Sequence, residues 1–291
     1  MSSSNRPRID TADKAQSPEA PSLTPPTLET LPAELRLRIL LSISDVADLR
    51  AVVRASPVLH QQYLLGRKKL LGHTLKKTLG SVFADAQALQ AATSLADFGE
   101  DVPSESIRGV LKRHLDEYVA HRFEPDILAQ CGVEDLVGIA SFYLSVIQPL
   151  LVEVPALFLH RLDASLEVGH LSNTERIRLL RGLYRFQLFY DVFKCETTRG
   201  PRDPHFSSAE KLGMFFTIFE PYEVEEIHCV YLAMRAKYLR ILEIVNPRVR
   251  RAASVAPPGD WDPTNCRCSS LANSPGCLLS SLLLPLCCLL A

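Results

Sequence analysis

Cysteine and histidine are the residue types in this sequence that could bind a transition metal ion. Cys195, His205, His228 and Cys229 would come together if the helices on either side of the loop between them packed against each other. Adjacent residues on a helix point about 100° apart, however, and neither pair has the spacing of a zinc finger. We therefore expect a buried cysteine beside partly exposed histidines, and no metal site.

A second group of cysteines lies near the C-terminus. Five of the eight cysteines fall there, namely Cys266, Cys268, Cys277, Cys287 and Cys288. A C-x-C pair is a weaker metal signature than two C-x-x-C pairs, and no histidine lies nearby. We predict no metal site in this segment either.

A run of basic residues could contact phosphate groups or an acidic protein. It consists of Arg67, Lys68, Lys69, Lys76 and Lys77, with no acidic residue between them. Leucines at positions 70, 71 and 75 alternate with these charges at helical spacing. Such a run is most often the solvated face of a helix, which is the interpretation we prefer.

The motifs of common enzymes are missing from the sequence. The 13 glycines form neither a dinucleotide-binding G-x-G-x-x-G nor a phosphate-binding P-loop. There is no G-x-S-x-G or H-E-x-x-H motif, no aspartate-rich prenyl-diphosphate motif and no His-Asp dipeptide. We therefore predict a protein that is not an enzyme and has no cofactor, with a helical enzyme of unrecognised type as the remote alternative.

The composition is typical of a globular protein that stays in water. The chain of 291 residues is 47% hydrophobic and has a formal net charge of -1, which argues against a whole-chain nucleic-acid binder. No apolar run in residues 1–26 resembles a secretory signal, so we expect a cytoplasmic or nuclear location. No run of about 20 uninterrupted apolar residues predicts a spanning helix, and we expect no membrane association.

Helical periodicity runs from residue 28 to about 246, without the alternation that predicts strands. We predict an all-α fold with a disordered leader at 1–26, a three-helix unit at 27–66, a larger irregular helical domain at 67–246 and a disordered tail at 247–291. The first helix is expected within Leu31–Ile43, with Pro32 in its first turn. Asp45 and Ser56 are expected to cap the second and third helices.

The larger domain carries further start and stop signals. Ser172 with Glu175, and Ser207 with Glu210, form capping boxes that predict helix starts. Pro149 is expected to end an apolar helix that begins near Glu134. A last helix is expected from about Pro221 to Val245, where Asn246-Pro247 would end it.

The first three expected helices resemble an F-box. The segment 28–43 has its Leu-Pro pair, a glutamate two residues later and an Ile-Leu pair, and 48–63 resembles the F-box variant of filamentous fungi. The phrases 183–186 and 221–231 also resemble that fungal group. Many F-boxes end with a basic residue and a tryptophan, whereas this chain has Tyr63 there and its single tryptophan at Trp261.

The resemblance implies an adaptor that joins a Skp-type subunit of a cullin-RING ubiquitin ligase to a protein substrate, which the sequence does not identify. The residues that match the motif either contact this subunit or form the unit's own core, and Leu31 and Pro32 are expected at the interface. The matching residues are Leu31, Pro32, Leu35, Ile39, Leu40, Leu49, Val52 and Val53. The alternative is an all-α interaction or structural protein with a relic F-box that the later helices cover.

The segment 247–291 differs in composition from the rest of the chain. It combines arginines, prolines and a final stretch of leucine and cysteine that contains Pro285 and is short for a membrane anchor. Cys287 and Cys288 could be acylated, although no C-a-a-X box is present. The abrupt change in composition also fits a mispredicted exon or a retained intron, so two explanations of the tail remain open.

Overall fold

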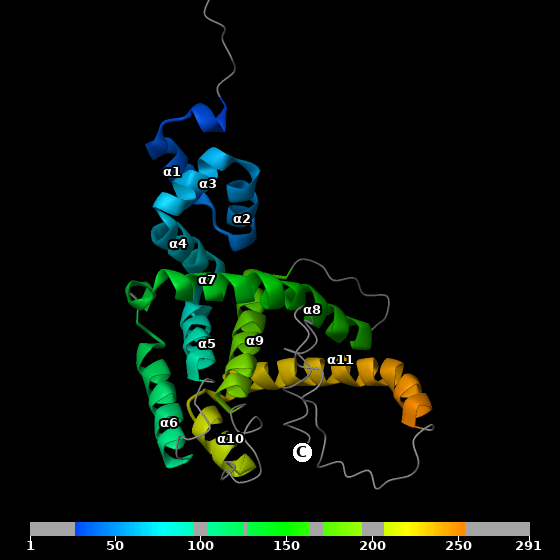
Figure 1. The fold of residues 1–291 in the computed structure, drawn as a ribbon. Coiled ribbons are helices and arrows are strands. Elements are labelled where there is room, and N and C mark those ends of the chain that lie inside the picture. Colours follow the sequence, from blue (N-terminus) through cyan, green and yellow to red (C-terminus); the bar gives the residue numbers. More distant parts are fainter. Residues whose placement is uncertain (1–26, 96–103, 125–126, 163–170, 194–206, 254–291) are drawn as a thin grey trace, which may run out of the picture.

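The chain folds into helices in the computed structural model, which describes residues 27–95, 104–124, 127–162, 171–193 and 207–253 (Figure 1). These residues contain no strand, so the predicted all-α class is confirmed. The predicted leader, most of the predicted tail, Cys195 and His205 lie outside the described residues.

Capping residues fix the starts of the first helices. After a short 3-10 turn, η1 (Leu28–Thr30), α1 (Ala33–Ser42) begins directly behind Pro32. The Asp45 carboxylate accepts a hydrogen bond from the Ala47 amide at 2.7 Å and opens α2 (Val46–Ala55). Ser56 caps α3 (Pro57–Leu65), in which Pro57 occupies the first turn. The three predicted helices and both predicted caps are confirmed, whereas Pro32, predicted in the first turn of the first helix, precedes α1 as its N-cap.

The next helices connect this N-terminal part to the rest of the molecule. α4 (Arg67–Leu79) ends at Gly80, whose φ of 56° suits a residue without a side chain, and η2 (Gly80–Val82) turns the chain into α5 (Phe83–Leu95). The remaining elements are α6 (Ser104–His121), η3 (Ile127–Gln130), α7 (Val133–Phe142), η4 (Tyr143–Ile147), α8 (Gln148–Leu162), α9 (Asn173–Phe193), α10 (Ser208–Phe216) and α11 (Pro221–Ala253).

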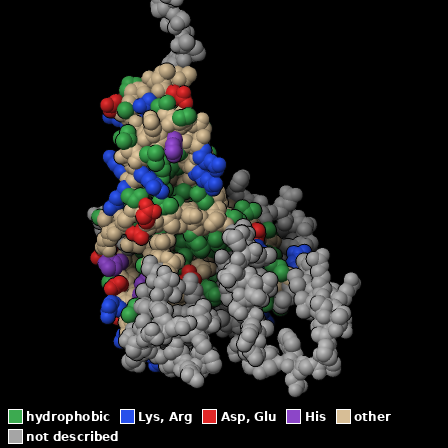
Figure 2. All heavy atoms as spheres, viewed as in Figure 1, with side chains coloured by type: hydrophobic (Ala, Val, Ile, Leu, Met, Phe, Trp, Pro, Cys, Tyr) green, Lys and Arg blue, Asp and Glu red, His purple; other side chains and the backbone are tan. Residues whose placement is uncertain are grey.

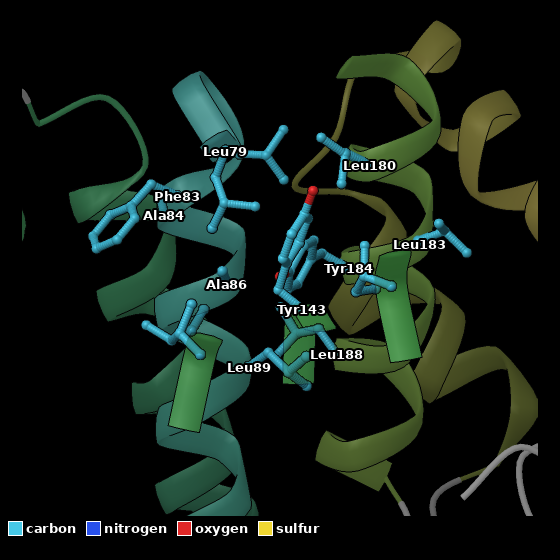
Figure 3. Close-up of a cluster of buried hydrophobic side chains, with 14 of the residues drawn as sticks. Leu79, Phe83, Ala84, Ala86, Leu89, Tyr143, Leu180, Leu183, Tyr184 and Leu188 are labelled. Carbon is cyan, nitrogen blue, oxygen red and sulfur yellow. The ribbon is translucent and has the colours of Figure 1, made fainter. Parts of the chain in front are cut away.

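Helix α9 forms the centre of the larger domain. It packs along α5 on one side and crosses α11 on the other. Figure 3 shows Tyr184 of α9 and Tyr143 of η4 between Ala86 and Leu89 of α5 and Leu183 and Leu188 of α9. Tyr143 and Tyr184 are almost fully buried, because α9 contacts neighbours on several sides, as its many aromatic residues predicted.

Two predicted helix ends are wrong, both at prolines. The chain continues past Pro149 because a π-helical turn, η4, precedes it, and the Gln148 amide bonds to the Tyr143 carbonyl. The helix α11 continues through Asn246 and Pro247 to Ala253 and changes direction near its orange end in Figure 1. A proline therefore interrupts or bends these helices locally without ending them.

The π-turn joins α7 and α8 into one long apolar helical segment. The segment Val133–Leu159 has a mean hydropathy of 1.7, and by length and composition it could cross a membrane. The sequence prediction considered only uninterrupted apolar runs, and this segment contains none of about 20 residues, so it passes by its average hydropathy alone. Leu136, Ile139 and Ile147 of this segment are buried in the hydrophobic core, and core helices pass the same test.

Helices α9 and α11 approach each other closely at Gly182. A Cβ atom added there would lie 2.8 Å from the Glu226 carbonyl oxygen and 3.0 Å from a Val230 methyl group. A backbone carbonyl cannot rotate away as a side chain can. The absence of a side chain at position 182 therefore sets the distance between these two helices.

We expect Gly182→Ala to destabilise the protein by about 1–3 kcal/mol, because the added methyl group must push α11 away from α9. Urea unfolding followed by circular dichroism measures the change. Gly109→Ala on α6 is the matched control, since a Cβ there meets nothing within 4 Å. It should raise the stability by about 0.5–1 kcal/mol, because alanine favours the helix. Equal effects of the two substitutions would contradict the close crossing.

Candidate partner-binding surface

The helices α1–α3, together with η1, stand at one end of the molecule (Figure 1). We call residues 28–65 the three-helix unit. Its helices pack on each other and on α4. Its buried side chains Leu40, Val46, Leu49 and Val53 belong to the same continuous hydrophobic core as the larger domain. The unit is thus attached through α4, and most of its outer side faces solvent.

The structure separates the predicted partner-binding residues into two groups. Leu40, Leu49 and Val53 are buried and serve the core of the three-helix unit. The other five keep part or all of their surface accessible: Leu31, Ile39 and Val52 are half-buried, and Pro32 and Leu35 are exposed. Leu35 is 44% exposed although it is a large apolar residue. Only this second group can contact a partner without unfolding the unit.

Three further apolar residues of the unit are exposed, and the F-box pattern did not identify them. Leu28 is 54%, Leu64 52% and Leu65 86% exposed. The apolar residues of α3 lie on more than one face of the helix, and only one face can pack against the core. This distribution could have identified Leu64 and Leu65 as exposed. Figure 2 shows hydrophobic side chains at the surface in several places on this unit.

Hydrogen bonds within the unit hold η1 in place. Ser56 donates from Oγ to Oε1 of Glu29 at 2.5 Å, and Arg36 donates from a guanidinium nitrogen to the Glu29 carbonyl at 3.0 Å. The first turn is therefore tied to the start of α3 and to α1. This fixes the segment that carries Leu28, Leu31 and Pro32. Tyr63, at the position of the usual tryptophan, is half-buried against the core.

One residue of the basic run on α4, Lys77, has a structural role. Lys77 donates from Nζ to the Leu41 carbonyl at 2.8 Å, near the C-terminal end of α1, where helical carbonyls lack partners. Next to it, the Thr78 hydroxyl donates to the Ser44 carbonyl at 3.0 Å. Lys68, Lys69 and Lys76 are exposed, as expected for a solvated face. Lys77 and Thr78 thus join the three-helix unit to α4.

A group of buried charged residues lies at the centre of the larger domain. Arg185 on α9 donates to Asp85 on α5 at 2.8 Å and to Glu223 on α11 at 2.9 Å. Tyr118 on α6 donates to Asp85, and Arg122 donates to Glu223 and, at 3.1 Å, to the Ile218 carbonyl. Arg122 and Arg185 also lie against the Phe219 ring, at 5.0 and 4.7 Å. We call these five residues, Asp85, Tyr118, Arg122, Arg185 and Glu223, the buried ion cluster.

The ionisation states in this cluster follow from its hydrogen bonds. Burial alone would raise the pKa of Glu223, but the bonds from Arg122, the Glu220 amide and Arg185 outweigh it and lower the pKa to about 2. Burial and the neighbouring Asp85 raise the pKa of Tyr118 well above its usual range. Two carboxylates therefore face two guanidinium groups. Every charge is compensated, which is the pattern of a structural cluster and not of a poised acid or base.

One small pocket among the described residues lies between α7, η4, α8, α9 and α11 and has an apolar lining. Its volume is about 10 Å³, room for about one water molecule, and Gln187 is its one strongly polar side chain. The apolar lining residues are Phe142, Val146, Ile147, Leu150, Leu183, Phe186 and Met234. None of the residues that line this pocket is a carboxylate or a histidine.

No group of three potential metal ligands comes together within the described residues. Of the four residues considered from the sequence, His228 is exposed and stacks on Tyr231, and Cys229 is half-buried. Burial raises the pKa of the Cys229 thiol, which disfavours the thiolate that binds metals. Cys195 and His205 lie outside the described residues, so the complete set stays untested.

Comparison of the chain with protein-family models, with curated proteins and with solved structures finds no match. The fold defines an all-α protein with a terminal three-helix unit on a helical domain. Its function must therefore be argued from its own exposed residues and from the motif in its sequence.

We expect Glu223→Gln to destabilise the protein by about 3 kcal/mol at neutral pH, because it leaves Arg122 and Arg185 without their shared anion. Glu223 has a lower pKa in the folded state than the ordinary 4.5, so its contribution is complete above that pH and is lost as the pH falls towards 2. Urea unfolding at several pH values should therefore show a weaker acid dependence for the variant. Glu225→Gln, an exposed neighbour, is the control and should change little.

We expect Lys77→Met to loosen the three-helix unit by about 1 kcal/mol, because the carbonyl group of Leu41 loses its donor. Hydrogen exchange measured by mass spectrometry should become faster in α1 and unchanged in α9. Lys69→Met, at an exposed position of the same helix, is the matched control. If both variants exchange like the wild type, Lys77 does not hold the unit.

Proposed function

We propose that this protein is a non-enzymatic F-box-like adaptor. In this proposal the three-helix unit binds a Skp-type subunit of a cullin-RING ubiquitin ligase, and the larger domain recruits another protein for ubiquitination in the cytoplasm or nucleus. One observation carries the proposal. Leu28, Leu35, Leu64 and Leu65 are each at least 44% exposed on a unit that stands at the end of the molecule and has an F-box-like sequence.

The energetics of the unit support a partner at this surface. A unit of this size cannot bury all of its apolar residues in its own core, so it keeps apolar surface for a partner. Covering one large exposed leucine stabilises a complex by about 1.5–3 kcal/mol at most. The bonds from Ser56 and Arg36 to Glu29 already order η1, so binding would require little further ordering.

Exposure also distinguishes this proposal from a relic F-box. In that alternative, the later helices would cover Leu31, Leu35 and Ile39. Leu35 is instead 44% exposed, the other two are half-buried, and α1 packs mainly on α3 and α4. A surface that remains accessible favours the adaptor over a relic built into the core.

We expect Leu35→Asp in the full chain to weaken binding to a purified Skp-type subunit by at least about tenfold, because it places a charge in an apolar contact. Isothermal titration calorimetry measures the affinity. Leu212→Asp on α10 is the control, since Leu212 is 50% exposed and lies outside the three-helix unit. Failure of the wild-type protein to bind at micromolar concentration would refute the proposal, as would full affinity of the Leu35 variant.

A further inference from the structure

The exposed side of α4 carries no acidic residue. Its exposed residues are Lys68, Lys69, His73, Lys76 and Lys77, and all of its leucines are buried. Lys69, His73 and Lys76 are four and three residues apart, so they lie along one side of the helix. Lys77 already donates to a backbone carbonyl of α1, whereas no carboxylate of the described residues forms an ion pair with Lys68 or Lys69. We call Lys68, Lys69, His73 and Lys76 the basic face.

The cations at the start of α4 do not stabilise this helix. Arg67, Lys68 and Lys69 occupy its first turn, where the helix dipole disfavours positive charge. This turn contains no acidic residue, and no side chain caps it. Local helix stability therefore does not explain these three residues, whereas a partner with negative charge would offset their repulsion.

The end of the molecule that carries α4 has an excess of positive charge. Residues 27–80 contain nine Lys and Arg against four Asp and Glu, although the whole chain has a net charge of -1. Two of these four carboxylates already form local bonds, because Glu29 accepts from Ser56 and Asp45 caps α2. Figure 2 shows Lys and Arg side chains at several places on this end.

The helices that pack on α4 add exposed charges of both signs. These helices are α1, α2, α3, α5 and α7. Their exposed acidic residues are Glu34, Asp48, Glu134 and Asp135, and their exposed basic residues are Arg38, Arg50 and Arg54. Asp135 accepts from the Gly132 amide at 2.8 Å and thus caps its own helix. With the four exposed lysines of α4, the cations outnumber these carboxylates.

Two exposed leucines come directly before the basic face. Leu64 is 52% and Leu65 86% exposed, and only two residues separate Leu65 from Lys68. Three peptide units span at most about 11 Å, so the leucine and the lysine lie within reach of one short segment of a partner. A partner that pairs with the lysines can therefore cover Leu65 as well.

An acidic protein segment fits this combination better than a nucleic acid does. Carboxylates of such a segment would pair with the lysines, and an apolar side chain of the same segment would cover the leucine. Single-stranded nucleic acids are bound largely by stacking of their bases on exposed aromatic rings. Tyr63 is the one Phe, Tyr or Trp residue in 27–80, and it is half-buried.

We propose that the basic face and Leu65 bind an acidic segment of a partner protein that also contains an apolar residue. The identity of this partner rests on the proposed function, under which the segment belongs to the Skp-type subunit, because Leu65 lies on the three-helix unit. The binding itself depends only on the charge of the basic face and on the leucine.

Fluorescence anisotropy of the full chain with four labelled probes of similar length tests this proposal. The probes are an acidic peptide with leucines, the same peptide with serines in place of leucines, a basic peptide with leucines, and a single-stranded DNA. We expect the first probe to bind most tightly, and its binding should weaken as salt rises from about 0.05 to about 0.3 M.

Lys68→Glu combined with Lys69→Glu should reduce the affinity for the acidic leucine peptide by at least about tenfold, and Leu65→Ser should reduce it by about fivefold. Lys112→Glu combined with Arg113→Glu is the matched control, because this adjacent basic pair is exposed on α6. Circular dichroism of each variant checks that the fold is retained.

Tighter binding of the DNA or of the basic peptide, no binding of the acidic leucine peptide, or wild-type affinity of the double lysine variant would overturn the proposal. The Skp-type subunit is titrated against the same variants and should lose affinity for the double lysine variant. If the subunit does not bind but the acidic peptide binds through the lysines, the proposed function fails and the binding surface stands. If the subunit binds this variant as tightly as the wild type, the assignment of the segment to the subunit fails and the proposed function stands.

Discussion

The guanidinium of Arg185 is the group on which the arrangement of the larger domain depends. It is 2% exposed and lies between Asp85 of α5 and Glu223 of α11. An isolated ion buried to this extent would destabilise the fold by several kcal/mol, so it is tolerated only while both carboxylates stay in place. The three helices must therefore keep their relative positions. Arg122 and Tyr118 extend the same requirement to the end of α6, because each donates to one of the two carboxylates.

This constraint places charged groups that pair with one another at the centre of the larger domain, while exposed leucines lie on the three-helix unit at the end of the molecule. The buried ion cluster pairs its own charges within the larger domain. The three-helix unit is attached mainly through α4, with hydrogen bonds from Lys77 and Thr78 to its backbone. Local opening should therefore require less free energy in the unit than around α9, where helices pack on several sides.

The sequence predicted the elements better than the contacts between them. Asp45, Ser56, Ser172 and Ser207 identified helix starts because a cap acts through bonds to residues a few positions away. The helix ends predicted at Pro149 and Pro247 were wrong because a proline disturbs a helix only locally. A π-turn before Pro149 and a bend near Pro247 allow the helical chain to continue. Leu35 and Leu40 both fit an apolar pattern, yet one is exposed and one buried, since only the packing of α1 on its neighbours separates them. No sequence pattern predicted the bonds of Arg185 to Asp85 and Glu223, because these residues are far from Arg185 in sequence.

Directional polar contacts form the junction between the three-helix unit and the larger domain. Tyr143, in the π-turn, donates to Asp45 of the three-helix unit at 3.5 Å and accepts from Arg176 of α9 at 3.0 Å. Arg176 also donates to the Thr78 carbonyl at 3.0 Å, at the end of α4. The cap of α2, the π-turn, α4 and α9 are thus linked by directional bonds. Apolar packing alone would permit sliding, whereas these bonds fix the angle at which the unit stands on the domain.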